Sequence, residues 1–177
     1  MTTASEVAKA LIHFAEADPE GEPMTALRLH KLLYYCQGWY LAWFGRPLFA
    51  DRIEAWKHGP VVPSVWATPW GQGRDAILDQ GPSSVPDPER DAIAQVWSHY
   101  RMFSALGLRE KTHEEPPWKQ HYAPDGTLRC SNVIPTSDLA SFFGEEFERK
   151  TGDRRGSNGT DAGSGISLER LREELGC

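Results

Sequence analysis

The chain has 177 residues, 40% of them hydrophobic and 11% aromatic, with a formal net charge of −6. This length suits one domain with a substantial core, and the acidic balance disfavours non-specific nucleic-acid binding, which depends on neutralising phosphates. The N-terminus has no signal-sequence pattern, no apolar run is long enough to span a bilayer, and three cysteines without metal-binding spacing indicate reduced thiols. We therefore expect a soluble, cytoplasmic protein that binds no membrane.

The first predicted helix begins at a capping-box pattern, Thr3 to Glu6, in which the hydroxyl and the carboxylate each accept from a free backbone N–H. A Pro- and Gly-containing loop from Asp18 to Pro23 ends it. Residues 25–44 form the strongest helix pattern, with one wide apolar face and a second apolar ridge nearly opposite, so we expect neighbours on both sides. Gly38 lies between the two ridges, where it would let another backbone approach closely.

A short strand is predicted within Asp51 to Lys57, because its apolar and polar residues partly alternate. Gly59-Pro60 is expected to break this strand, and Val61 to Trp66 to form a short helix. The abundance of Gly and Pro from Pro69 to Pro88 predicts a loop.

The next helix is predicted to begin at Asp87 as N-cap, with Pro88 in its first turn, and to end near Gly107. An irregular stretch containing Thr112 to Trp118 should follow. Leu128 to Ile134 is the expected partner strand for Ile53 to Trp56, and a final long helix should open at Pro135 and Ser137 and run through Phe147.

These elements predict a mostly helical α+β fold over residues 1–150: a single domain around the central helix, with a small sheet of two or three strands. Residues 151–165 are almost entirely small or polar, which predicts a flexible linker. Residues 166–177 carry helix cap and stop signals, which predict a short amphipathic helix. Its apolar stripe should dock on the parent domain or on a partner, and consists of Leu168, Leu171 and Leu175.

No catalytic or metal-binding set emerges from the sequence. His113-Glu114 lacks the second histidine of a zinc-protease helix, and Gly71-Gln72-Gly73 lacks the strand and Lys-Ser pair of a phosphate-binding loop. Cys36 falls on the apolar stripe of the central helix, which favours a buried structural thiol over a nucleophile. We therefore expect no enzyme activity, no metal and no cofactor.

Two segments, 55–63 and 112–118, combine aromatic, cationic and proline residues. Under a packing interpretation the tryptophans brace loops, and the prolines reduce the freedom of the unfolded chain. Under a functional interpretation the segments converge into a partner-binding patch, because polar groups on rigid loops commonly bind. Both interpretations remain open, and the candidate binding residues are Trp56, Lys57, His58, Gly59, Pro60, Val61, Thr112, His113 and Trp118.

Four segments carry a family resemblance: Met24–Ala42 with its Leu-His-Lys-Leu-Leu-Tyr-Tyr run, Gly45–Phe49, Ile53–Pro63 with Ala-Trp-Lys-His-Gly-Pro-Val, and Thr112-His113 with Pro117-Trp118. In this order and spacing the chain resembles the Panacea domain, the antitoxin domain of SocA-type proteins, also met in phage and mobile-element genes. The resemblance implies a protein encoded beside a toxin that it neutralises by direct contact. It also implies a proteolytic adaptor that delivers the toxin to the ClpXP protease through ClpX. An enzyme of unrecognised type and a DNA-binding autorepressor are the alternatives.

Overall fold

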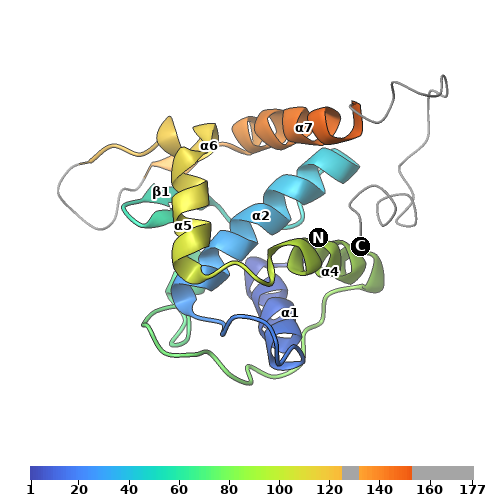
Figure 1. Ribbon diagram of the computed structural model, residues 1–177, viewed down its shortest axis with the longest axis vertical. Coiled ribbons are helices and arrows are strands. Elements are labelled where there is room, and N and C mark those ends of the chain that lie inside the picture. Colours follow the sequence, from blue (N-terminus) through green and yellow to red (C-terminus); the bar gives the residue numbers. More distant parts are fainter. Residues whose placement is uncertain (125–131, 153–177) are drawn as a thin grey trace.

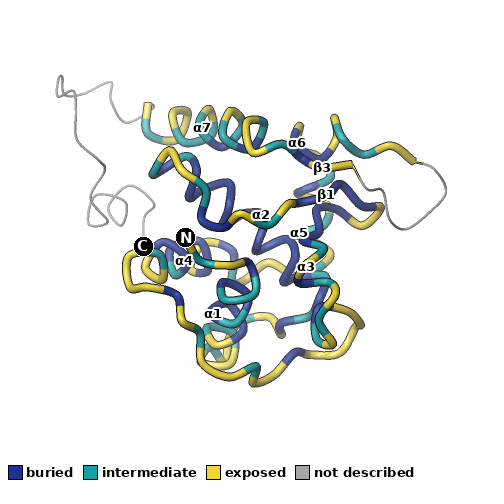
Figure 2. Tube along the Cα trace, turned by 180° about the vertical axis from the view of Figure 1, so that it is seen from behind, coloured by how far each residue is buried: buried dark blue, intermediate teal, exposed yellow. Residues whose placement is uncertain are grey.

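One long helix, α2 (Ala26–Phe44), runs through the middle of the protein, and the other elements pack around it (Figure 1). The computed structural model describes residues 1–124 and 132–152. Of the 19 residues of α2, 16 are buried, whereas exposed residues lie on the outer faces of the surrounding elements (Figure 2). The prediction of a central helix with neighbours on both sides is confirmed. The helices that pack most extensively on it are α1 (Ala4–Glu16), α4 (Asp87–Tyr100), α5 (Ala105–Glu114) and α7 (Thr136–Gly152).

The caps explain where the first two helices begin. Thr3 Oγ1 accepts a hydrogen bond from the backbone N–H of Glu6 at 3.3 Å, which is one half of the predicted capping box. The Glu6 carboxylate accepts instead from the backbone N–H and the hydroxyl of Ser84, at 2.6 and 2.9 Å, and so ties a distant loop to α1. Thr25 caps α2, which ends at Gly45 with a left-handed φ of 65°.

The small sheet is antiparallel and has the strand order β2-β1-β3. Strand β1 (Ile53–Trp56) and strand β2 (Gly59–Val61) form a tight hairpin in which Trp56 pairs with Gly59. The prediction that Gly59-Pro60 breaks the strand is therefore wrong: the chain reverses at Lys57 and His58, and both following residues belong to β2. A proline is tolerated there because β2 is an edge strand.

The third strand, β3 (Val133–Ile134), pairs with the other side of β1 and confirms the expected pairing for these two residues. Of the other residues predicted for this strand, 128–131 lie outside the described residues. The short helix α3 (Pro63–Trp66) follows β2, and no helix or strand is assigned between Pro69 and Pro86. The mostly helical fold with a small sheet is thus confirmed.

The prediction of one helix from Asp87 to near Gly107 is wrong, because the chain forms two helices, α4 and α5, with a sharp connection between them. Pro86, rather than Asp87, is the N-cap residue of α4. Ser104 caps α5 by accepting from the backbone N–H of Gly107 at 3.1 Å. Thr112 and His113 consequently lie in the last turn of a helix, and Trp118 lies in a further short helix, α6 (Pro116–Lys119).

The buried side chain of Arg28 stabilises the connection between α4 and α5. Its guanidinium donates to the backbone carbonyls of Arg101 at 2.6 Å, Phe103 at 3.1 Å and Glu22 at 2.5 Å. Hydrogen bonds from a charged donor are stronger than those between neutral groups. Arg28 therefore holds the connection in a fixed shape from inside the protein.

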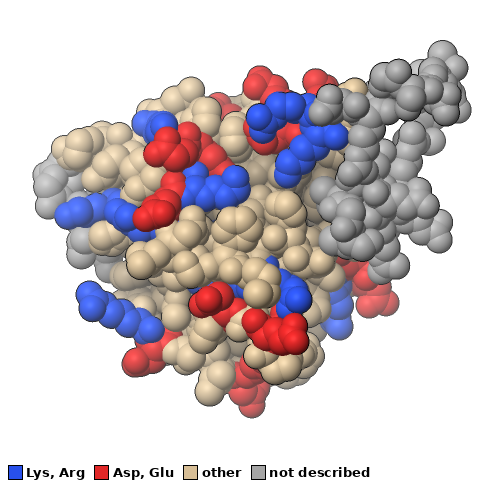
Figure 3. Space-filling model, viewed as in Figure 1, with Lys and Arg blue, Asp and Glu red and all other residues tan. Residues whose placement is uncertain are grey.

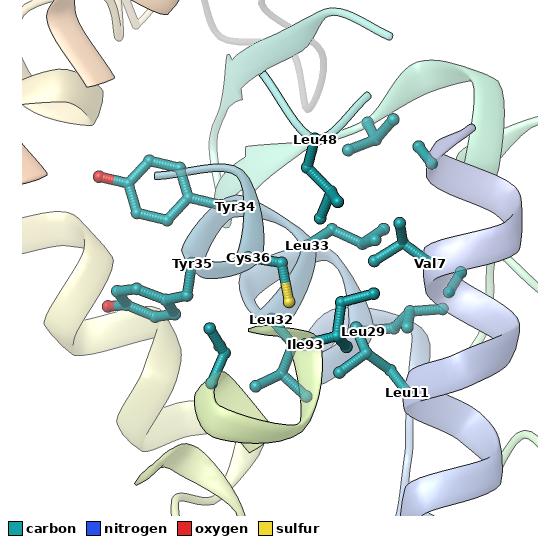
Figure 4. Packing of buried hydrophobic residues seen from close by; sticks show 14 of the residues in the cluster. Val7, Leu11, Leu29, Leu32, Leu33, Tyr34, Tyr35, Cys36, Leu48 and Ile93 are labelled. Carbon is teal, nitrogen blue, oxygen red and sulfur yellow. The ribbon is translucent and has the colours of Figure 1, made fainter. Parts of the chain in front are cut away.

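The core lies between α2 and its helical neighbours (Figure 4). Leu29, Leu32, Leu33 and Cys36 of α2 pack with Val7, Leu11 and Ile93, while Tyr34 and Tyr35 extend toward another side of the helix. Cys36 is 1% exposed, which confirms a buried thiol, and burial raises its pKa. The close approach predicted at Gly38 is made by the ring of Phe143 from α7, not by a backbone.

Helix α7 runs to Gly152, two residues past the predicted end of the domain. The rest of the predicted linker and the predicted helix 166–177, with Leu168, Leu171 and Leu175, lie outside the described residues. Within the described part of the chain, no helix combines the length and apolar character needed to cross a bilayer.

Candidate binding site

The hairpin β1–β2 lies against the C-terminal end of α5, so the two candidate segments converge as predicted (Figure 1). Gly59 lies where the hairpin packs closely on α5 and α2. A Cβ atom built on it would be 2.9 Å from Oγ1 of Thr112 and 2.5 Å from Cε of Lys31. Its φ of 98° also lies in a region that side-chain-bearing residues rarely adopt. Glycine at this position therefore lets the hairpin pack on both helices.

Two tryptophans connect the segments. Nε1 of Trp118 donates to the backbone carbonyl of Trp56 at 2.9 Å, a bond between residues 62 positions apart. The His113 ring stacks on Trp118 with a centroid distance of 3.9 Å and an interplanar angle of 6°. Trp56 in turn donates from Nε1 to the Glu54 carboxylate at 2.8 Å. These contacts fix the hairpin, α5 and α6 into one frame.

Most of the candidate residues belong to this frame and are buried, and Trp56, Val61, Thr112 and Trp118 are each at most 7% exposed. The backbone of Gly59 and Pro60 is buried as well. Lys57 and His58 are exposed in the hairpin turn, and His113 is half-buried. Among the candidate residues predicted from the sequence, the side chains that a partner could reach are therefore Lys57, His58 and part of His113.

A fully buried lysine lies beneath the hairpin. Nζ of Lys31 donates to the backbone carbonyl of Pro60 at 3.0 Å. Burial, and after it the charge of Arg109, lowers the pKa of Lys31 to about 7. Neither Lys31 nor Arg109 is among the site residues predicted from the sequence. The signals that point to them are a cation inside a helix with two apolar sides, and an Arg one turn before His113 on α5.

The histidines of the site share the same environment. Burial first, and then the charges of Arg109, Lys31 and His58, lower the pKa of His113 to about 4. Burial and then Arg109, Lys57 and Lys31 also lower the pKa of His58. Within residues 1–124 and 132–152, no three His, Cys, Asp or Glu side chains are grouped as metal ligands would be. The site therefore offers cations, proton-accepting imidazoles and stacked rings on a rigid frame.

The geometry defines a small helical domain that presents a rigid hairpin-and-helix surface. Residues 29–119, just over half of the chain, match the family model described as "Antitoxin SocA-like, Panacea domain", and the chain therefore belongs to this family. This range contains both segments of the candidate site. Membership in the family supports an antitoxin role for the protein.

A curated relative agrees with this assignment. The protein named Antitoxin SocA from Caulobacter vibrioides (strain NA1000 / CB15N) is 50% identical to this chain over 58 residues. The matched segment covers 33% of this chain and 31% of that protein, so the chain spans less than a third of the relative's length. No solved structure matches the chain.

Proposed function

We propose that this protein neutralises a cognate protein toxin by direct contact, and that the hairpin turn and the end of α5 form the contact surface. The observation that carries this proposal is the family match over residues 29–119, which includes both segments. The accessible side chains of that surface are Lys57, His58 and His113. The buried candidates around them, such as Trp56 and Trp118, hold the surface in place.

Two physical features support this role. The Trp118–Trp56 hydrogen bond and the His113–Trp118 stack fix the structure under the turn. Binding a partner therefore costs little conformational entropy in this part of the protein. The net charge of −6 gives the whole protein a long-range attraction for a basic partner. An antitoxin with both features would attract a basic toxin at long range and present a preformed surface to it.

Co-expression with the neighbouring gene tests the proposal. That gene should be toxic alone and harmless beside this protein, and the two products should co-purify. The double variant Lys57→Ala/His58→Ala should weaken neutralisation, whereas Arg74→Ala, an exposed cation in another loop, should not. If the neighbouring gene is harmless by itself, or stays toxic beside the wild-type protein, the proposal is wrong.

The adaptor role places a second function in the C-terminal residues. On this proposal the residues after α7, with Leu168, Leu171 and Leu175, contact ClpX and bring the bound toxin to ClpXP. Because α7 ends at Gly152, truncation after that residue is the appropriate variant. It should still neutralise the toxin but lengthen the toxin's half-life in the presence of ClpXP. Unchanged toxin turnover would contradict the adaptor role, and a lower melting temperature would indicate docking on the parent domain.

A further inference from the structure

We propose that Arg109 and His58, backed by His113 and Lys31, receive a carboxylate side chain of the protein partner. This inference rests on the proposed function for the class of partner, and it adds the chemistry by which that partner is recognised. Nothing in the family match assigns a ligand to these residues. The position of these side chains, their unpaired polar atoms and the sign of the charges around them support this inference.

The first observation is the position of the four side chains. Arg109 and His113 are four residues apart on α5, so they share one face of that helix. That face meets the hairpin, since Thr112 on the same helix and Lys31 from α2 both contact Gly59. Lys31 of α2, Arg109 and His113 of α5, and His58 of the β1–β2 turn therefore lie around the place where the hairpin meets α5.

The second observation is that polar atoms at this point lack partners. Nε of Arg109 and Nε2 of His113 are buried, and neither has a hydrogen-bond partner among residues 1–124 and 132–152. Buried polar groups in folded proteins are nearly always hydrogen-bonded. The stack on Trp118 fixes the plane of the His113 ring. The Arg109 side chain is only half-buried, so its guanidinium can still meet a ligand from outside.

The third observation is the sign of the local charge. The charged groups that act on His58 are Arg109, Lys57 and Lys31, and the one that acts on Lys31 is Arg109. The charged groups that act on His113 are Arg109, Lys31 and His58, and the acid that acts on it, Glu114, has the smallest influence. The Glu114 carboxylate is paired with Lys119 at 2.9 Å. A carboxylate from a partner would relieve this repulsion and form charge-assisted hydrogen bonds.

The surroundings favour one carboxylate over a nucleic-acid backbone. Glu110 and Glu114 are both exposed on α5 beside Arg109 and His113. Figure 3 shows acidic and basic side chains close together on the face that carries α5 and α7. A chain of phosphates would meet these acids as well as the cations, in a protein of net charge −6. A single acidic side chain needs only the small basic point, and the planar fork of Arg109 suits its geometry.

The first experiment uses the full chain and acetate as the probe. The imidazole resonances are followed by NMR while acetate replaces chloride at constant ionic strength. We expect acetate to shift His58 and His113 and to raise the pH at which each gains its proton, while the resonances of His13 and His121 stay in place. Arg109→Gln should abolish this response and Arg74→Gln should keep it. Equal shifts of all histidines, or an unchanged response in Arg109→Gln, would overturn the site.

The second experiment separates the site from the proposed function. Arg109→Gln should weaken binding of the cognate toxin about tenfold, as expected for the loss of a charge-assisted contact, and Arg109→Lys should recover part of it. His58→Gln, at an exposed turn position, should also weaken binding, and wild-type affinity should rise as the pH falls.

If toxin binds Arg109→Gln as tightly as wild type, the site is refuted while the antitoxin proposal stands. If the wild-type protein binds no toxin, the proposed function fails and the acetate titration alone decides the site. Salt-sensitive binding of a short oligothymidylate at Arg109, without an acetate response, would overturn the carboxylate assignment.

Discussion

The ring of Phe143 lies directly on Gly38. A Cβ atom built on this glycine would be 2.1 Å from Cε2 and 2.6 Å from Cζ of the ring. The ring is held in place by edge contacts with Tyr34 at 5.5 Å and Trp39 at 5.2 Å between centroids. Phe143 therefore fills a notch in α2 that exists only because residue 38 has no side chain, and this contact joins α7 to the central helix.

The substitution Gly38→Ala tests this contact. The added methyl group must displace a ring that is 1% exposed, and such overpacking costs about 1–3 kcal/mol. Gly144→Ala in α7 is the matched control, because nothing lies within 4 Å of its built Cβ; there, alanine should stabilise the helix by about 0.5–1 kcal/mol. Urea denaturation of both variants gives the two values, and equal effects would contradict the notch.

Truncation of the central helix's apolar side chains should be costly. Leu32 and Leu33 are both 0% exposed, so Leu32→Ala or Leu33→Ala should lower the free energy of unfolding by about 2–5 kcal/mol. Leu106 is 63% exposed on α5, and Leu106→Ala should change it by no more than about 0.5 kcal/mol. Thermal melts of the three proteins measure the difference; melting temperatures that match the parent would contradict the position of α2.

Gly59 allows a similar paired test at the candidate site. Gly59 and Gly73 have the same φ of 98°, but the built Cβ of Gly73 meets nothing within 4 Å. Gly73→Ala should therefore cost only the backbone strain, about 1–2 kcal/mol. Gly59→Ala should cost clearly more, because its methyl group also meets Lys31 and Thr112, and it should weaken toxin binding by moving the hairpin. Equal costs in chemical denaturation would show that the hairpin does not pack tightly on α5.

The buried Lys31 should give the protein a pH-dependent stability. Its pKa is about 7 in the folded state, below an ordinary value of 10.5. Between these values the unfolded chain holds a proton that the folded chain has released, so stability rises with pH. The slope contributed by one group is at most about 1.4 kcal/mol per pH unit.

Comparison with Lys31→Met isolates this contribution. Between about pH 7 and about pH 9, below the range in which tyrosines ionise, wild-type stability should rise relative to that of the variant. Lys57→Met, at an exposed position in the hairpin turn, is the control and should follow the wild-type curve. Parallel curves for wild type and Lys31→Met in urea titrations would mean that Lys31 stays charged in the fold.

The helical framework can be predicted from the amino-acid order alone. Two apolar ridges placed α2 at the centre, because a helix that is apolar on two sides must have neighbours on both. The capping-box signal at Thr3 marks the start of α1 correctly, since a cap needs only residues a few positions apart. Under the functional interpretation, the residue types shared by segments 55–63 and 112–118 also predict that these two segments converge.

Contacts between segments that are far apart in the sequence determine where helices end and which candidate residues reach the surface. The helix predicted to run to Gly107 is divided because the Arg28 guanidinium donates hydrogen bonds to the carbonyls of Arg101 and Phe103, which lie 73 and 75 residues away in the sequence. Trp56 and Trp118 are buried and hold the hairpin against α6 through a hydrogen bond between positions 62 residues apart. The low pKa of Lys31 likewise depends on the hairpin and α5 closing over α2. Periodicity and caps report interactions within a few residues, whereas burial and electrostatic environment are set by segments that meet only when the chain has folded.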